Sequence, residues 1–194
     1  MKIEKIKMHD HASAQCVLGN KTTDGIKLGG VFDVWCLRDG KEIWREHVHN
    51  IVTTEGQNFI LNACFHTAGA TVPATWFVGL VNTDTAPLVT MTYHAPAFTE
   101  SVAYDNIAVR ATYTTVDSTA ASMTNSAAPA SFTISGTETM YGAALFSIDT
   151  RGDHTESVGV NALYSYAKFT AGRAVVDNDV INVTYTLTTV DDAV

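Results

Sequence analysis

Two histidine pairs have a spacing that could hold a metal ion: His9 with His11, and His47 with His49. On a β-strand, residues i and i+2 point to the same face, so either pair could supply two adjacent ligands. A zinc site takes three or four protein ligands, and no nearby cysteine or acid completes either set. We therefore expect no metal site and no cofactor, and interpret both pairs as polar positions on a strand face.

Arg151-Gly152-Asp153 matches a tripeptide that some cell-adhesion receptors recognise. Three residues often match by chance, and this tripeptide lies among turn-forming residues between two predicted strands. The favoured interpretation is a hairpin turn, with receptor binding as the alternative.

The residues that could act as nucleophiles or acids do not form a catalytic set. The sequence contains no Gly-x-Ser-x-Gly motif. Cys64 falls on the apolar stripe of a predicted helix, which favours a place in the core. Asp177 and Asp179 are an i, i+2 acid pair, but they belong to a turn before a predicted strand. We expect no catalytic residues and predict that the protein is not an enzyme.

One stretch of the chain has a helical period. Thr54 is a suitable N-cap, and Gln57, three residues later, completes a capping box. Apolar residues then recur at helical spacing. The members of this stripe are Phe59, Ile60, Ala63 and Cys64. The pattern predicts a helix over residues 55–66, with Phe59 and Ile60 buried.

Strand signals fill most of the remaining sequence. Residues 31–38 and 41–49 flank Asp39-Gly40, a dipeptide typical of type I′ hairpin turns. A buried strand that is apolar on both faces is predicted over residues 75–82, with Trp76 in the core. Further strands are predicted over residues 107–114, 130–135, 140–148, 163–169 and 180–187.

About eight strands at this spacing predict a mainly β fold, an antiparallel β-sandwich of the jelly-roll-like or Ig-like kind. The helix near residues 55–66 would plug or flank the sandwich. We expect a sandwich domain over residues 31–194 and an extended N-terminal arm over residues 1–30. The arm lacks a hydrophobic period, so it should order only against a neighbouring subunit. Its expected contacts are Ile3, Ile6 and Val17, with Lys5 and Lys7 meeting acidic surface.

A long connection over residues 83–97 contains Pro87 and Pro96. Structureless loops of this length are uncommon in compact domains, so the length suggests a functional role or a partner. Aromatic residues in or near such loops can form a platform for sugars. On this hypothesis Tyr93 and Tyr104 would be exposed and would bind a carbohydrate or a receptor.

Charge and composition exclude several classes of partner. The formal net charge is −8, and residues 1–50 hold eight of the 12 basic residues. The chain after residue 50 is therefore acidic overall. Such a surface disfavours binding to nucleic acid, because phosphate contacts need clustered Lys and Arg. No apolar run is long enough to span a membrane, and charged residues interrupt the N-terminus, so we expect no signal peptide. The three cysteines, Cys16, Cys36 and Cys64, are expected to be reduced and mostly buried.

Several short segments, in their order and spacing, resemble a family of small structural proteins of tailed bacteriophages. The segments are NIVTTEGQNFIL (residues 50–61), WFVGL (76–80), FTIS (132–135), MYGAALF (140–146) and DVINVTYTL (179–187). The resemblance covers residues 44–187 and leaves residues 1–30 outside. It implies a β-rich subunit that acts by assembly and not by turnover.

Our first hypothesis is a virion structural protein, a capsid cement or decoration subunit that stabilises joints between capsid proteins. The alternative is a tail, neck or fibre component with a receptor- or carbohydrate-binding role. The expected partners are copies of the same chain, as a trimer or dimer, and other virion proteins, above all the major capsid protein. Neither nucleic acid nor a membrane is expected, and the protein would be made in the host cytoplasm and reside in the virion.

Overall fold

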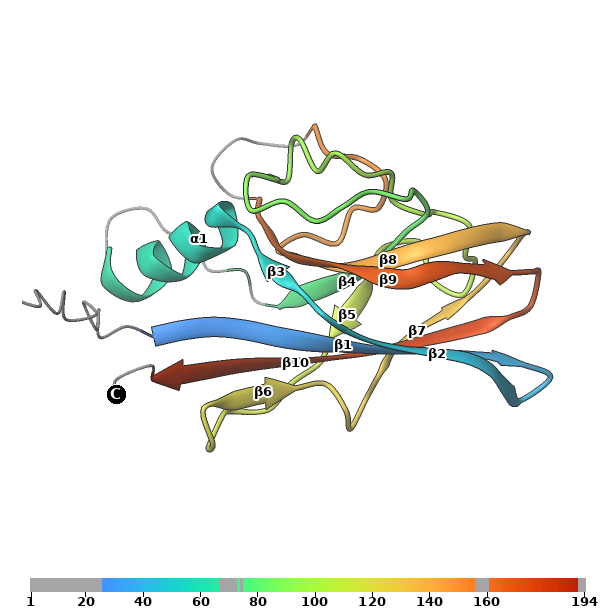
Figure 1. The fold of residues 1–194 in the computed structure, drawn as a ribbon, viewed down its shortest axis with the longest axis horizontal. Helices are drawn as coiled ribbons and strands as arrows, with labels where there is room; N and C mark the ends of the chain where they lie inside the picture. The colour runs from blue at the N-terminus through green and yellow to red at the C-terminus, as the bar shows by residue number, and fades with distance from the viewer. Residues whose placement is uncertain (1–25, 67–72, 74, 156–160, 192–194) are drawn as a thin grey trace, which may run out of the picture.

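The computed structural model describes residues 26–66, 73, 75–155 and 161–191. Within these residues the fold is mainly β, with antiparallel strands in two sheets and one α-helix (Figure 1). The predicted antiparallel sandwich with one helix is therefore confirmed. Residues 1–25, which include most of the predicted arm, His9, His11 and Cys16, lie outside the described residues.

Sheet A has the strand order β2-β1-β10-β6, and β7 pairs with the same edge of β10 as β6. Its strands are β1 (Ile26–Arg38), β2 (Lys41–His49), β6 (Ser122–Thr124), β7 (Ala130–Thr133) and β10 (Val180–Asp191). The two longest members, β1 and β10, pair along almost their whole length, from Ile26 opposite Asp191 to Leu37 opposite Val180. This pairing forms the centre of the sheet.

Sheet B has the strand order β3-β9-β8-β4-β5. Its strands are β3 (Ile51–Val52), β4 (Trp76–Val81), β5 (Ala111–Tyr113), β8 (Glu138–Phe146) and β9 (Leu163–Val175). The chain passes from sheet A to sheet B at Asn50, whose backbone N–H donates to the carbonyl of Gly30. Strands β2 and β3 thus join the two sheets along one side of the sandwich.

The predicted hairpin at Asp39-Gly40 is confirmed. Both residues have positive φ, 51° and 74°, as a type I′ turn requires. Arg38 and Lys41 pair directly across the turn. The register shifts one residue later, because Leu37 lies opposite Glu42 and Cys36 opposite Trp44, which leaves Ile43 as an exposed bulge.

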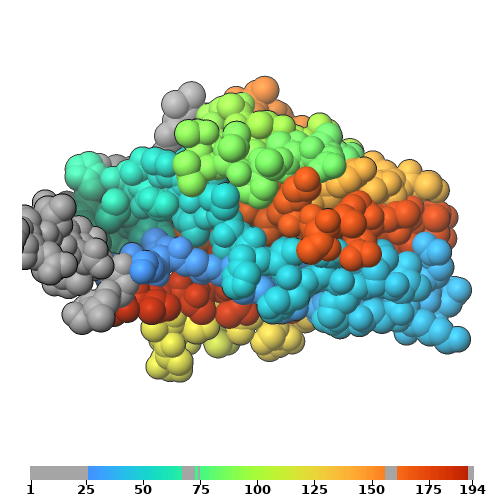
Figure 2. All heavy atoms as spheres, viewed as in Figure 1, coloured from blue at the N-terminus to red at the C-terminus, as the bar shows by residue number. Residues whose placement is uncertain are grey.

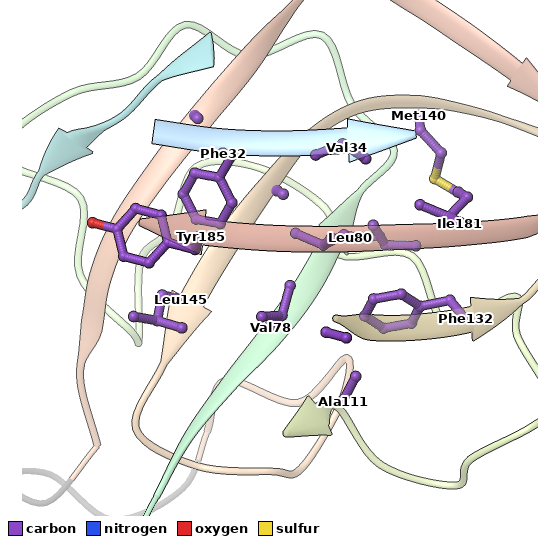
Figure 3. Packing of buried hydrophobic residues seen from close by; sticks show 14 of the residues in the cluster. Phe32, Val34, Val78, Leu80, Ala111, Phe132, Met140, Leu145, Ile181 and Tyr185 are labelled. Atoms are coloured by element: carbon purple, nitrogen blue, oxygen red, sulfur yellow. The ribbon is translucent and has the colours of Figure 1, made fainter. Parts of the chain in front are cut away.

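The space between the sheets holds the main core. Phe32 and Tyr185 of sheet A stack with ring centroids 4.3 Å apart, and they face Val78 and Leu80 of sheet B (Figure 3). Gly30 allows this packing, since a Cβ there would lie 2.5 Å from the Tyr185 ring. Burial of apolar surface on this scale is the main force that holds the two sheets together.

A second core lies on the other face of sheet B. Residues 82–110, here called the covering segment, fold back over this face between β4 and β5 (Figure 1). Met91, Tyr93 and Phe98 of the covering segment pack against Phe146 of β8 and Leu163 of β9. Sheet B is therefore apolar on both faces, as predicted for residues 75–82, although Trp76 itself is only half-buried.

Some element boundaries differ from the predictions. The predicted strand over residues 107–114 shortens to β5, because the backbone of residues 107–110 bonds to loops: Arg110 N donates to Asp149 O, and the carbonyl of Ile107 accepts from Arg151. The short strands β3 and β6 were not predicted. The predicted arm boundary after residue 30 falls inside β1, because β10 pairs with residues 26–30 as well.

Helix α1 (Thr54–Phe65) matches the predicted helix, but its cap and its burial differ from the prediction. The N-cap is Thr53, whose Oγ1 accepts from Gly56 N at 2.9 Å, so the predicted capping box at Thr54 is wrong. The first turn is buried where Gly56 meets the backbone of Tyr164. Beyond that turn the stripe is less enclosed. Phe59, Ile60 and Ala63 are half-buried and Cys64 is exposed, so full burial of this stripe is also wrong.

Candidate functional site

A groove of about 540 Å³ lies beside α1. One wall is the helix between Thr54 and Asn62, and the other is formed by residues 89–94 of the covering segment together with residues 161–162. In the space-filling view the covering segment, in green, lies directly against the helix, in teal (Figure 2). The volume falls within the range of sites for small molecules, roughly 300–1,000 Å³.

Residues at the start of α1 fix both walls of the groove. Thr53 Oγ1 donates to the carbonyl of Leu163 at 2.5 Å, and Thr54 N donates to the carbonyl of Val89 at 2.8 Å. Glu55 Oε2 accepts from Tyr93 N at 2.7 Å and from Leu163 N at 2.8 Å. Burial raises the pKa of the Glu55 carboxyl, and these two backbone hydrogen bonds oppose that rise.

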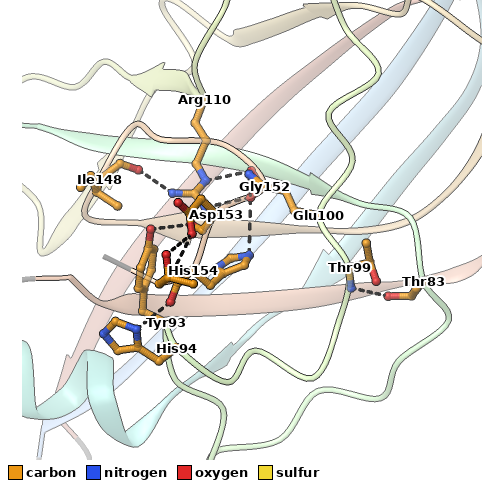
Figure 4. A network of polar contacts seen from close by, with 11 residues as sticks. Thr83, Tyr93, His94, Thr99, Glu100, Arg110, Ile148, Gly152, Asp153 and His154 are labelled. Atoms are coloured by element: carbon orange, nitrogen blue, oxygen red, sulfur yellow. Dashed lines mark hydrogen bonds and ion pairs between the residues drawn. The ribbon is translucent and has the colours of Figure 1, made fainter. Parts of the chain in front are cut away.

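A fully buried ion pair joins two residues of the covering segment to each other. Arg110 and Glu100 have no exposed side-chain surface and form two parallel hydrogen bonds of 2.8 Å (Figure 4). The Arg110 guanidinium lies 3.8 Å from the centre of the Phe146 ring and donates a further bond to the carbonyl of Ile148. The bidentate geometry, with a hydrogen bond from each of the three guanidinium nitrogens, is what makes such a buried pair tolerable.

The Arg151-Gly152-Asp153 turn belongs to this network. Arg151 Nη1 donates to the carbonyl of Tyr104 at 2.6 Å, and Gly152 N donates to Glu100 Oε2 at 2.9 Å. Asp153 Oδ1 accepts from the backbone and the hydroxyl of Thr155. The tripeptide is therefore committed to internal contacts, which agrees with the predicted turn.

Histidine 154 lies next to the ion pair. Its Nε2 is 3.7 Å from Glu100 Oε2, and its ring contacts Tyr93 at 5.2 Å between centroids. Desolvation lowers the pKa of His154, although the charge of Glu100 acts in the opposite direction. The Tyr93 hydroxyl donates to the carbonyl of Asp153 at 2.7 Å, which closes the network around the second core (Figure 4).

The predicted exposed tyrosine platform is wrong. Tyr93 is fully buried and Tyr104 is 1% exposed. Tyr93 fills the second core, while the ring of Tyr104 packs on Phe132 with centroids 4.9 Å apart. These tyrosines position the covering segment and present no aromatic surface to a ligand.

The other candidate residues from the sequence do not lie together at one site. His47 and His49 lie on the outer face of β2, where His47 Nδ1 pairs with Asp33 Oδ1 at 2.8 Å. Asp179 is buried at the turn before β10 and binds Arg38 and Val176 N, while Asp177 is exposed. Among the described residues no group of three or more His, Cys, Asp or Glu could hold a metal ion.

No described segment of the chain covers the outer face of sheet A over its three longest strands. Outward residues form rows across β2, β1 and β10, because the register places them side by side. The rows are His49-Val31-Thr186, His47-Asp33-Thr184 and Arg45-Trp35-Asn182. In the last row the Arg45 guanidinium lies 4.8 Å from the centre of the Trp35 ring. We call this surface the bare face.

A buried acid at the edge of sheet A links the two sheets. Glu46, 3% exposed, faces inward from β2 and accepts from Thr170 N of β9 at 3.1 Å. Its Oε1 also accepts from Arg173 Nε at 2.5 Å. The alternation of β2 placed Glu46 on the inner face beside Trp44 and Val48, and an inward acid requires such partners.

Sequence reasoning missed the residues that build the groove and its support. Glu55 carried one signal, an acid in the first helical turn, which favours interaction with the free N–H groups there. Glu100 and Asn161 lie in segments without a period, and Arg110 lay in a predicted strand whose pattern did not indicate an ion pair. The unusual length of the connection over residues 83–97 did indicate a functional role, and this connection is part of the covering segment.

Compared with protein-family models and with curated proteins, the sequence matches none. Among the described residues, the single helix is too short and too polar to cross a membrane.

Proposed function

We propose that this protein is a structural subunit of a tailed-bacteriophage virion that acts as a capsid cement or decoration protein. It would assemble with copies of itself and with the major capsid protein, and would bind across the joints between capsid proteins. Such a subunit acts by burying surface, which opposes the outward pressure of packaged DNA.

The bare face of sheet A is the observation that carries this proposal. Apolar and polar residues alternate along β10, with Ile181, Val183 and Tyr185 inside and Thr184 and Thr186 on the bare face. The outward residues Asn182, Thr184 and Thr186 are short, and Arg45 of β2 lies over the Trp35 ring of β1. A flat surface of this kind can be covered by another subunit with little loss of side-chain entropy.

The rest of the fold suits a passive mechanical role. The two cores on either side of β8 and β9, the Arg110–Glu100 pair and the Glu46 contacts all fix one arrangement of the sandwich. The segments that resemble phage structural proteins include the central strands of this arrangement. A rigid subunit loses little conformational freedom on assembly, so more of its contact energy remains available for binding.

Labelling of particles tests the proposal. Antibodies against the folded protein should decorate the heads of phage particles from cells that carry the gene, as seen by negative-stain electron microscopy. Antibody bound only to tails would contradict the cement role and support the tail or fibre alternative. Particles that carry none of the protein would contradict both.

A further inference from the structure

The groove beside α1 contains polar side chains that have no partner within the described part of the chain. Asn58 and Asn62 lie one helical turn apart, so both face the groove from the same side of α1. Neither side chain makes a hydrogen bond to another described residue. Asn161 lines the opposite wall and is 8% exposed, and its buried Nδ2 has no hydrogen-bond partner among the described residues.

An unpartnered buried donor is unusual in a folded protein, because nearly all such groups are paired. Here the group of this kind is Asn161 Nδ2, and the exposed carboxamides of Asn58 and Asn62 line the same cavity, which is large enough for a small molecule. A ligand with groups that both donate and accept would satisfy all three, because each carboxamide also does both. The pattern thus indicates a ligand rich in hydroxyl groups.

The apolar part of the groove narrows the ligand class. Phe59 lines the groove, is half-buried, and its ring is held edge-on to Trp76 at 5.0 Å between centroids. A sugar ring has an apolar C–H face that can lie against an aromatic side chain and a rim of hydroxyls that can reach carboxamides. A purely apolar occupant would instead bury the carboxamides without partners.

The charge of the groove excludes anions. Its ionisable lining residues are Glu55 and His94, and the Glu55 carboxylate lies at the helix N-terminus, where it offsets the positive end of the helix dipole. The protein as a whole carries a formal charge of −8. A carboxylated or phosphorylated ligand would meet repulsion, whereas a neutral one would not.

We propose that the groove between α1 and residues 89–94 is a binding site for a neutral saccharide. Asn58, Asn62 and Asn161 bind the hydroxyls, and Phe59 supports one face of the ring. The site is separate from the bare face of sheet A and does not depend on the role proposed for that face. The buried network behind Tyr93 keeps the wall of the site in place.

Nuclear magnetic resonance of the ¹⁵N-labelled full chain tests this site. The probes are the methyl glycosides of glucose, galactose, mannose and N-acetylglucosamine, with methyl glucuronide as an anionic probe and trialanine as a peptide probe. At least one neutral glycoside should shift the side-chain amide signals of Asn58, Asn62 and Asn161. Methyl glucuronide and trialanine should leave them unchanged.

Substitutions then locate the binding. Asn58→Ala and Asn62→Ala should each weaken the glycoside affinity about three- to tenfold, the effect of one lost hydrogen bond. Gln57→Ala, an exposed position on another side of α1, is the matched control and should bind normally. No shift with any neutral glycoside, equal shifts with trialanine, or unchanged affinity in Asn62→Ala would each overturn the proposal.

Discussion

The outer faces of the two sheets differ in what covers them. On sheet B, the covering segment places Met91, Tyr93 and Phe98 over the strands and adds a second core. On sheet A, the rows that contain Trp35 and Thr184 have no cover from residues 26–66, 75–155 or 161–191. The connection between β4 and β5 thus covers one sheet, whereas no described segment covers these rows of the other sheet.

The sequences of the strands account for this difference. β10 alternates apolar and polar residues, as is typical of a sheet with one face in solvent. β8 carries the continuous apolar run Ala143, Ala144, Leu145 and Phe146, whose members divide between the two cores. A strand that is apolar on both faces needs cover on both, and the covering segment supplies it.

The largest expected change in stability comes from loss of the buried Arg110–Glu100 ion pair in the covering segment. Arg110→Ala leaves the buried Glu100 carboxylate without its ion-pair partner, and should lower the free energy of unfolding by about 3–5 kcal/mol in denaturant titrations. Arg45→Ala on the bare face is the matched control. Because Arg45 pairs with Glu42 in solvent, its loss should not measurably change stability. If the two variants lost equal free energy of unfolding, the covered face would contribute no more to stability than the bare face, which would contradict this account.

A smaller effect is expected at the turn that begins β10. The Arg38 guanidinium lowers the pKa of the Asp179 carboxyl, and a hydrogen bond from Val176 N acts in the same direction. Asp179→Asn should therefore cost about 1.5–3 kcal/mol at neutral pH, as expected for hydrogen bonds to a buried charged group. Such a loss would show that sheet A is held internally and does not need a partner to fold.

The sign of the pH dependence follows from the lowered pKa. The Asp179 contribution is fully present above the carboxyl's ordinary pKa of 3.8 and is lost as the pH falls through the lowered value. The stability difference between the native protein and Asp179→Asn should therefore shrink in strongly acidic solution. A difference that grows on acidification would contradict this assignment.

A still smaller loss is expected at the edge of the groove. Phe59 is half-buried and contacts Trp76, so Phe59→Ala should cost about 1–2 kcal/mol, less than the 3–5 kcal/mol of a fully buried phenylalanine. Thermal unfolding followed by circular dichroism measures it. A loss of the full size would mean that the helix stripe is as enclosed as the sequence predicts.

Local patterns were sufficient to predict the parts of the fold that depend on neighbouring residues. Asp39-Gly40 specified its turn through backbone preference, and the alternation of β10 specified which face would be bare. The helix was located by its period. Its exposed Cys64 was not anticipated, because a stripe shows which side of a helix is apolar but not how far the sandwich extends beneath it.

The candidate sites depended on contacts between distant segments and could not be predicted in the same way. Glu100 and Arg110 meet only because residues 82–110 fold back over sheet B. Tyr93 was assigned to the surface because loops are usually exposed. Its burial follows from the apolar outer face of β8, which the pattern of β8 alone could have indicated.

Incorporation of face variants into particles tests the central claim, that the bare face of sheet A is the assembly surface. Thr184→Arg places a long charged side chain in the middle row of this face, while Thr99→Arg places one on the exposed side of the covering segment. Both variants should fold normally. Particles should contain at least about tenfold less Thr184→Arg protein than Thr99→Arg protein, because covering a long charged side chain, which loses its water, weakens an interface by more than about 1.4 kcal/mol. Equal incorporation of the two variants would contradict the claim.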